Sequence, residues 1–562
     1  MDKRTQDHIW LANIMRGNKI FFSLSLFFLA LFFIPVAYLI LGNYILATST
    51  LKQINQFSFS ELGNAILNSL IFAIGGASLA TILGFIYAWI SIRTNVPLKR
   101  LLRALTLLPL ATPMLIKAFA WIYLFSPQIG IINNLARQIF GIEVLFNIYS
   151  LPGIIFAFGL GGIPLAYIIF EPVLKSLDSS LEENARVCGS GLLTVFRKVT
   201  IPIIFPAILS IFILLLIVAF DNFDYPLILG TPVNIYTLAT LIYYWVYEYI
   251  PPNYGLASLT SVFYVVITFT LFYLYYLSTK RIFKYITVTG KMSERTLYNL
   301  GKWKYLALSI CIIIIIISFF LPFSIVMLMS FSGSYQLNNF TLNNYIQFFN
   351  LPLVYQSMEN SLLFSFGAGF GATLIALLLS YSALRSKIKG SRIIEIFSNV
   401  PLAFPGIVYG LALFWTFLLF PVISYLIYGT LIPLIISLIF IRLPYSVRIV
   451  SNNMLQLSPE LEESSTVCGG SFLTTVRKIL IPLLNKGLIN SFLYTFIDSL
   501  RELGGIILLV TPQSIVLIIL LLQLYDQSAW ALNVVAAGSV ILTVIVSVIL
   551  IILEVVNRKL GR

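Results

Sequence analysis

Several charged residues lie inside segments of the chain that are otherwise apolar. Five of them are candidates for function: Lys117, Asp221, Asp224, Arg501 and Glu502. A charge inside an apolar span is costly, so such residues pair with one another or line the path of a substrate or ion. Carboxylate oxygens suit a hard cation, whereas the two cationic side chains would attract an anion. We therefore expect these five side chains to line a translocation path, with purely structural pairing between helices as the alternative.

The sequence contains no recognisable catalytic or metal-binding constellation. The only histidine is His8, and Cys188, Cys311 and Cys468 have neither metal-ligand spacing nor a convincing disulfide pattern. No Ser–Lys pair stands out, and no Gly-x4-Gly-Lys-Ser/Thr run is present to bind ATP. We therefore predict no catalytic residue, no metal site and no cofactor, and we expect that this chain does not itself hydrolyse ATP.

Two loops of the chain resemble each other and differ from all the others. Each contains an acidic residue, a glycine and a proline at equal spacing: Glu183, Gly189 and Pro202 in loop 181–202, and Glu463, Gly469 and Pro482 in loop 461–482. Acidic residues in the first turn of a helix complement its dipole, a glycine then ends the helix, and a proline suits the start of the next one. An ordinary amphipathic surface loop is the alternative, but two copies at equal spacing favour a shared function.

The two loops resemble the EAA loop of ABC importer permeases. The spacing matches, although Asn184-Ala185 and Ser464-Ser465 stand where the family has two alanines. The resemblance implies a type I importer permease in a fused two-domain form, in which each loop is a coupling helix. It further implies two copies of a cytoplasmic ABC ATPase subunit and an external solute-binding protein as partners.

Two further segments resemble one branch of that family. Residues 222–230 and 500–509 are similar to the fifth- and eleventh-span signatures of permeases for ferric iron and its relatives. Those relatives include thiamine, phosphonate, polyamine and inorganic anion importers, and the fusion of both halves in one chain is typical of the ferric iron branch. Ferric iron is therefore the expected cargo. The other solutes remain open, because specificity in such importers lies mostly in the binding protein.

The composition requires a membrane. Hydrophobic residues make up 59% of the chain and charged residues 10%, against roughly 25% charged in soluble domains. The net charge of +14 does not indicate nucleic acid, because the Lys and Arg residues sit in short loops and form no continuous basic face. We expect a multi-pass protein of the cell membrane, in contact with the lipid bilayer and not with nucleic acid.

Apolar runs long enough to cross a bilayer, about 20 residues, predict an all-α membrane protein with about twelve transmembrane helices in two parallel six-helix halves. The predicted spans are 21–47, 64–92, 104–126, 151–174, 203–229, 256–279, 305–330, 360–384, 394–419, 430–450, 487–511 and 530–556. Segment 513–525 is too short to span and is expected to be re-entrant or external. Cationic residues concentrate in the 2–3 loop, the central linker, the 8–9 loop and the C-terminus, which places both termini in the cytoplasm.

The two halves repeat one another. Asn68-Ser69-Leu70 recurs as Asn360-Ser361-Leu362, and the run Pro109–Pro113 recurs as Pro401–Pro405 at the same separation. Even numbers of spans in each copy make the copies parallel. We therefore expect a first half at 1–280, a basic cytoplasmic linker at 281–304 and a second half at 305–562.

Two other classes of protein compete with this interpretation. An ion-coupled secondary transporter could also have six-plus-six parallel repeats, but it would not need the duplicated loops. An intramembrane enzyme would need a catalytic constellation, which the sequence does not offer.

Overall fold

A computed structural model describes residues 19–41, 59–176, 180–282, 297–333, 339–386, 388, 390–527 and 532–560. Among these residues regular secondary structure is helical, apart from two isolated β-bridges. The far N-terminus, the end of the first predicted span beyond residue 41 and most of the predicted linker fall outside the described residues.

Nine helices of the described residues are long and apolar enough to cross a membrane, and up to thirteen spans result if each of four bent helix pairs counts as one. The prediction of an all-α membrane protein is thus confirmed. The long helices are the N-terminal helix Lys19–Leu41, α2 (Phe59–Arg93), α10 (Ile201–Phe220), α12 (Tyr254–Ile282), α13 and α14 (Lys304–Ile315 and Leu321–Phe331), α16 (Val354–Leu384), α20 (Ile432–Met454), α23 (Ile481–Ser499) and α25 (Leu532–Leu560).

Two predicted spans are broken near their middle. In the first half, α3 (Lys99–Leu107) and the 3-10 turn η1 (Leu108–Ala111) meet α4 (Met114–Phe125) at 97°; in the second, α17 (Ser391–Asn399) and η8 (Val400–Ala403) meet α18 (Gly406–Leu419) at 100°. Pro113 and Pro405 stand at the two breaks. Proline lacks an N–H and restricts the residue before it, so it ends the preceding helix. The repeated proline run therefore marks a repeated bend.

Two other predicted spans are too long. Helix α10 ends at Phe220 and α23 at Ser499, so the last residues of predicted spans 203–229 and 487–511 are not part of those helices. After α10 the chain continues through η3 (Pro226–Gly230) to α11 (Leu238–Tyr243) and η5 (Tyr244–Glu248), a pair bent by 71° that was not predicted. Segment 513–525 overlaps α24 (Leu517–Gln527). This helix of the second half corresponds to α11 of the first half.

The same side-chain contacts recur in both halves. The Asn68 side chain donates to Tyr236 O at 3.0 Å, and Leu238 N donates to Ser69 Oγ at 2.8 Å. In the second half, Asn360 donates to Ile515 O at 2.9 Å, and Leu517 N donates to Ser361 Oγ at 2.8 Å. The recurring Asn-Ser pair thus holds the start of α11 in one half and of α24 in the other.

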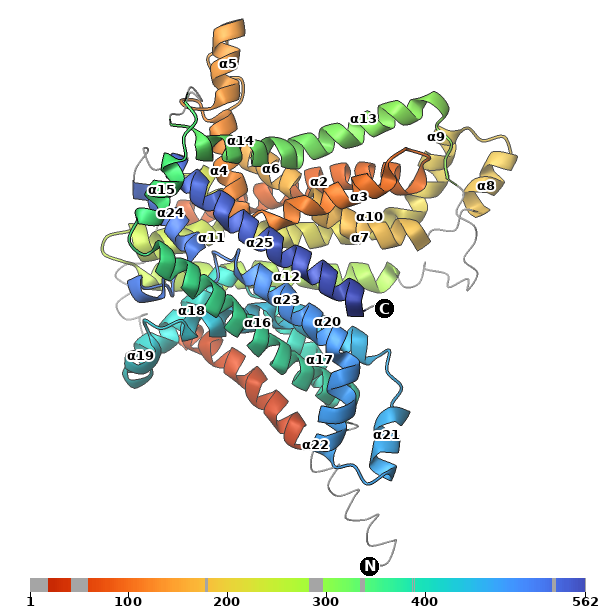
Figure 1. The fold of residues 1–562 in the computed structure, drawn as a ribbon, viewed down its shortest axis with the longest axis vertical. Helices are drawn as coiled ribbons and strands as arrows, with labels where there is room; N and C mark the ends of the chain where they lie inside the picture. Colours follow the sequence, from red (N-terminus) through yellow and green to blue (C-terminus); the bar gives the residue numbers. More distant parts are fainter. Residues whose placement is uncertain are drawn as a thin grey trace, which may run out of the picture.

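One helix of the predicted first half packs against the second half, and two helices of the second half pack against the first. In Figure 1 the red N-terminal helix lies along the teal and blue helices of the second half, while green α13 and α14 lie along the first half. Phe32 stacks on Tyr409 with ring centroids 5.0 Å apart, and Ser25 Oγ donates to Ser382 Oγ at 2.8 Å. Helices α13 and α14 pack on α2 and α4. The two halves are thereby interlocked.

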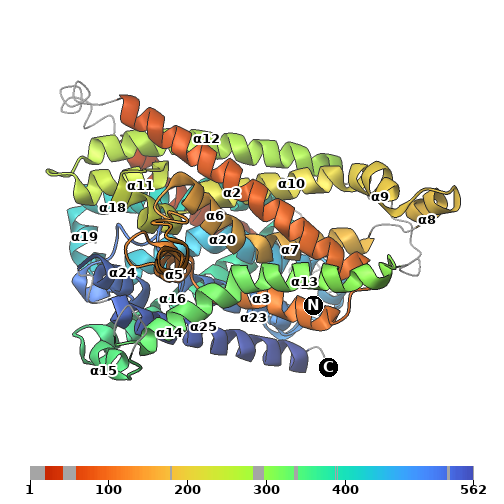
Figure 2. The ribbon, with the colours of Figure 1, turned by 90° about the horizontal axis from the view of Figure 1, so that it is seen from above.

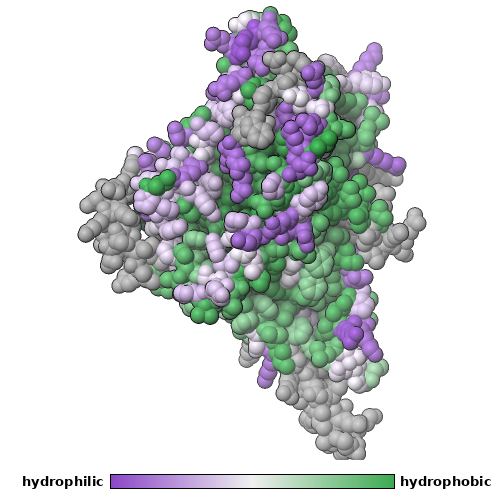
Figure 3. All heavy atoms as spheres, turned by 60° about the vertical axis from the view of Figure 1, so that its left-hand side comes forward, coloured by the Kyte–Doolittle hydropathy of each residue, from purple (hydrophilic) through white to green (hydrophobic). Residues whose placement is uncertain are grey.

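Several short helices lie at the two ends of the bundle. The loop helices α8 (Ser180–Val187) and α21 (Glu460–Val467) project from one end (Figure 1), and α5 (Ile131–Phe140), α15 (Asn343–Asn350) and α19 (Pro421–Ile427) lie toward the other (Figures 1 and 2). Figure 3, which brings the α5 end forward, shows polar side chains gathered there and a hydrophobic surface along the flank.

The first half's fourth span is α6 (Leu151–Gly161) and α7 (Ile163–Ser176), bent by 44°.

Candidate functional site

The two loops fold in the same way. Helices α8 and α21 each carry acidic residues in their first turn and end before a glycine with positive φ, +84° at Gly189 and +83° at Gly469. No atom would meet a Cβ at either glycine, so the backbone conformation and not space favours glycine there. Short helices α9 (Leu192–Val195) and α22 (Phe472–Thr475) and a π-turn in each half then lead to α10 and α23. Pro202 and Pro482 stand in the first turn of those two helices.

An ion pair that was not predicted anchors each loop, buried in the first half and partly buried in the second. Arg93 at the end of α2 pairs with Glu182, and both side chains are almost completely buried. In the second half Arg385 Nε lies 3.3 Å from Glu462 Oε1. The neighbouring Glu183 and Glu463, by contrast, are exposed. The two adjacent glutamates of each loop therefore have different roles: one holds the loop to the bundle, and the other faces outward.

Further contacts fix the first anchor. Thr200 Oγ1 donates to Glu182 Oε1 at 2.7 Å. Tyr298 N donates to Arg93 O at 2.8 Å, so the segment that leads into the second half is attached to the end of α2. In the second half, the Arg385 guanidinium donates to the carbonyl oxygens of Met454 and Leu457 at 3.0 and 2.6 Å.

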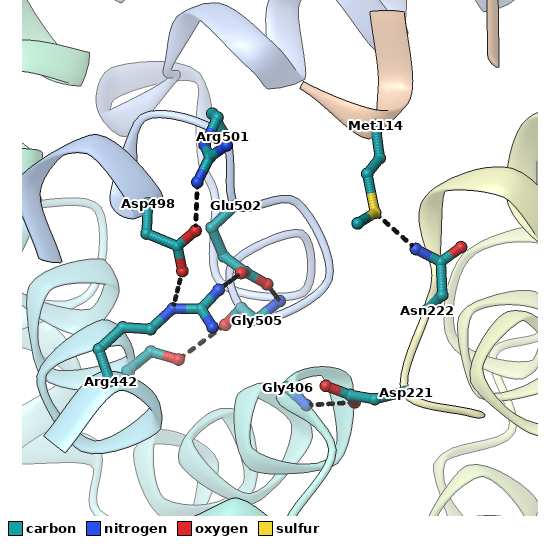
Figure 4. A network of polar contacts seen from close by, with 10 residues as sticks. Met114, Asp221, Asn222, Gly406, Arg442, Asp498, Arg501, Glu502 and Gly505 are labelled. Atoms are coloured by element: carbon teal, nitrogen blue, oxygen red, sulfur yellow. Dashed lines mark hydrogen bonds and ion pairs between the residues drawn. The ribbon is translucent and has the colours of Figure 1, made fainter. Parts of the chain in front are cut away.

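A second polar cluster lies inside the bundle, where α10 and α23 end (Figure 4). Arg442 of α20 is at its centre: Nε lies 2.7 Å from Asp498 Oδ2, and Nη2 contacts Glu502 Oε2. Arg501 donates to Asp498 Oδ1 at 2.6 Å and also to the carbonyl oxygen of Leu110 in the first half. Arg501 is thus in an ion pair, as the structural alternative for the five charged residues required. Arg442 was not predicted as a site residue, although it is a charge inside the apolar span 430–450.

The first half contributes the facing side of this cluster. Asp221 follows α10, is exposed, and its Oδ1 accepts a hydrogen bond from Gly406 N at 3.3 Å. Asn222 donates to Met114 Sδ at 3.0 Å and accepts from Tyr225 N at 3.2 Å, which forms the turn after the helix. Gly406 and Met114 are the first residues of α18 and α4. The positive ends of both broken helices therefore face the polar cluster.

Asp224 and Lys117 lie apart from the ion pairs. Oδ1 of Asp224 is buried and has no hydrogen-bond partner within the described residues. Lys117 of α4 is 6% exposed and lines a small cavity with Thr112, Ser318 and Thr543, between α4, α14 and α25. No carboxylate within 4.0 Å of its ammonium occurs among the described residues, contrary to the pairing expected as its structural alternative.

This arrangement brings charged side chains of both signs together where the two halves meet. Four carboxylates and three cations are distributed around the ends of α10 and α23, with two helix N-termini between them. Within the described residues, no three His, Cys, Asp or Glu side chains form a group that could hold a metal ion. An ion that entered would meet separate carboxylates and not a closed metal cage.

Both halves of the chain match the same known protein family. Residues 80–284 and 372–562 match the family described as "Binding-protein-dependent transport system inner membrane component". The chain belongs to this family. Each matched region contains one of the two loops, so the permease is a duplication with one loop helix, α8 or α21, in each copy.

Several named permeases are similar to this one. The ferric transport system permease protein FbpB of Actinobacillus pleuropneumoniae is 26% identical over 86% of this chain and 70% of its own. A putative ferric transport permease of Haemophilus influenzae is 26% identical over 81% of this chain and 71% of its own. A probable sulfate permease of a Helicosporidium species is 36% identical over 25% of this chain and 49% of its own.

Among solved structures, a bacterial ABC transporter involved in the import of alginate covers 46% of this chain and 97% of its own, at 18% identity and a TM-score of 0.37.

The buried anchors of the permease give a first prediction. Glu182→Gln removes the carboxylate that neutralises Arg93, so α8 should open more easily, at a cost of about 3–5 kcal/mol for an uncompensated buried charge. Glu183→Gln, at the adjacent exposed position, is the matched control and should leave the loop as protected as in the unmodified protein. Hydrogen exchange of the backbone amides of residues 180–200 measures the difference. Equal exchange in both variants would show that the ion pair does not hold the loop.

Proposed function

We propose that this ABC importer permease carries ferric iron across the membrane, receiving it from an external solute-binding protein. The observation that most supports this cargo is the similarity to two ferric transport permeases over most of the chain. The sulfate permease matches only a quarter of the chain, although at higher identity. An inorganic anion is therefore the second candidate.

We further propose that α8 and α21 are the coupling helices, each docking on one copy of a separate cytoplasmic ATPase subunit. The exposed Glu183 and Glu463 and the buried anchors next to them support this role. Both termini would then lie in the cytoplasm, on the side where α8 and α21 project. The division into a first half at 1–280, a linker at 281–304 and a second half at 305–562 belongs to the same proposal.

The polar cluster is proposed as part of the translocation path. Asp221 and Asp224 supply carboxylates that are not in ion pairs within the described residues, and these suit a hard cation. Lys117 and Arg501 are the groups that an anion would use. The cluster therefore allows a test of the sign of the cargo's charge.

Charge-neutralising variants should separate the two candidates. If the cargo is ferric iron, Asp221→Asn with Asp224→Asn should reduce its uptake at least roughly tenfold, the loss expected when about 1.4 kcal/mol of cation stabilisation is removed. Lys117→Met with Arg501→Met should then leave iron uptake much less affected. Uptake of labelled ferric iron and labelled sulfate is measured in vesicles that contain the assembled importer, with folding of each variant checked by size-exclusion chromatography.

The reverse pattern, with sulfate uptake lost in the Lys117 and Arg501 variant, would replace iron by an anion as the cargo. Normal transport by both folded variants would instead place the path elsewhere in the bundle. Transport that continues without an ATPase subunit would contradict the proposed coupling.

A further inference from the structure

A pocket of about 340 Å³ lies at the α8 end of the first half, between the end of α2, the start of α3 and the end of α7. The charged residues that line it are Arg93, Lys99, Arg100, Arg103, Glu171 and Lys175. Neither the family match nor the proposed path accounts for it, because it is separate from the polar cluster inside the bundle.

The pocket contains more positive than negative charge. Five of its side chains are cationic, and Glu171 is the only carboxylate among the lining residues. One of the five, Arg93, is already paired with Glu182 behind the pocket wall. Glu171 already contacts Arg103, at 3.1 Å, and Lys175. Neither Lys99 nor Arg100 forms an ion pair with any of the described residues. Like charges brought together around a concave surface repel one another, so an anion in the pocket would be bound favourably.

The charge is only partly repeated in the second half. At the separation that relates Arg93 to Arg385, Arg100 corresponds to Arg392, whereas Lys99 and Arg103 correspond to Ser391 and Glu395. At the separation that relates Glu182 to Glu462, Lys175 corresponds to Leu455. A general preference for cations in cytoplasmic loops accounts for the two repeated arginines. The other three cations make the charge of this pocket a feature of the first half.

The chemistry of the lining favours a phosphate. Arginine and lysine are the residues that bind phosphate oxygens. Ile92, Leu174 and Leu297 add an apolar side to the same pocket. It lies where α2 and α7 end, and basic pockets between the ends of transmembrane helices recognise anionic lipid headgroups. We propose that this pocket binds the phosphate headgroup of an anionic phospholipid.

The position of the pocket connects it with the first loop. Arg93 lines the pocket and is also the partner of Glu182, which anchors α8. A phosphate in the pocket would act on the same guanidinium as Glu182. A bound phosphate would therefore change how firmly Arg93 holds α8. This consequence is independent of the nature of the transported solute.

Native mass spectrometry of the full-length permease tests the proposal. The protein is released from nanodiscs made of phosphatidylglycerol and phosphatidylcholine, and the retained lipid is counted. We expect retention of phosphatidylglycerol by the unmodified protein, and a decrease of at least roughly tenfold in apparent affinity for Lys99→Gln with Arg100→Gln, from two lost cation–phosphate contacts. Lys302→Gln with Lys304→Gln removes two cations outside the pocket and should retain the lipid.

The other outcomes overturn the proposal. Equal retention in both double variants would place the lipid elsewhere. Binding of inorganic phosphate without retention of phosphatidylglycerol would make the ligand a free phosphate and not a lipid. Loss of ATPase binding by Lys99→Gln with Arg100→Gln, without any change in lipid retention, would show that the pocket is a protein-docking surface. A thermal unfolding curve for each variant confirms that it is folded.

Discussion

Reversing the two exposed loop charges, in the variant Glu183→Arg with Glu463→Arg, is expected to abolish transport while the permease remains folded in the membrane. Each substitution places a positive charge at a helix N-terminus, which costs only about 0.3–1 kcal/mol at an exposed position. This cost is too small to unfold a helix whose neighbouring glutamate is held by a buried ion pair. Loss of transport would therefore reflect loss of docking on the ATPase.

Co-purification of the ATPase subunit and uptake by the assembled importer measure the effect. Glu143→Arg with Glu359→Arg is the matched control, because it changes the net charge equally at exposed positions outside the two loops. The control should bind the ATPase normally. If the loop variant does so as well and transports at the normal rate, then α8 and α21 are not the coupling helices.

Much of the fold could be predicted because apolar length and repetition are visible in a sequence. The Asn-Ser pairs and the proline runs were recognised as repeats, and the structure gives each a physical role. The Asn-Ser pairs hold the starts of α11 and α24, and the proline runs end in Pro113 and Pro405, where two spans bend. What hydropathy did not give was the end of α10 at Phe220 and of α23 at Ser499, because a few charged residues follow each helix and apolar residues then resume, at 225–229 and 503–510.

The central cluster was predicted only in part. Asp221, Arg501 and Glu502 stood out as charges within apolar segments, and Asp221 and Arg501 are also separated by the same number of residues as Glu182 and Glu462. All three belong to the polar cluster of Figure 4. Arg442 has Gly162 at the matching position of the first half, so the repeat gave no signal. Only the fact of a charge within an apolar span could have revealed it.

The loop anchors illustrate a different limit. Glu182 and Glu183 are adjacent and chemically identical, and so are Glu462 and Glu463. A motif defined by spacing selects one of each pair, but burial decides which of them is an anchor. The signal that was available is the correspondence of Arg93 with Arg385, two arginines at the same place in the repeat, each needing a carboxylate once buried.

Arg442→Met is expected to be strongly destabilising. The substitution keeps an unbranched apolar side chain. Among the described residues it leaves Glu502 with no ion-pair partner and Asp498 with Arg501 alone. Removing one member of a buried ion pair costs about 3–5 kcal/mol. We therefore expect a large decrease in the thermal unfolding temperature of the purified permease.

Two further variants separate this effect from a general loss of charge. Arg448→Met, at an exposed position of the same helix α20, should unfold close to the temperature of the unmodified protein. Adding Glu502→Gln to Arg442→Met removes the carboxylate left without a partner and should restore part of the lost stability, because a neutral amide is easier to bury than an unpaired charge. If Arg442→Met and Arg448→Met unfold at the same temperature, then the Arg442 cluster does not stabilise the bundle. Its charges would in that case be solvated by water inside the permease, as expected of residues that line an open path and not of a clamp between helices.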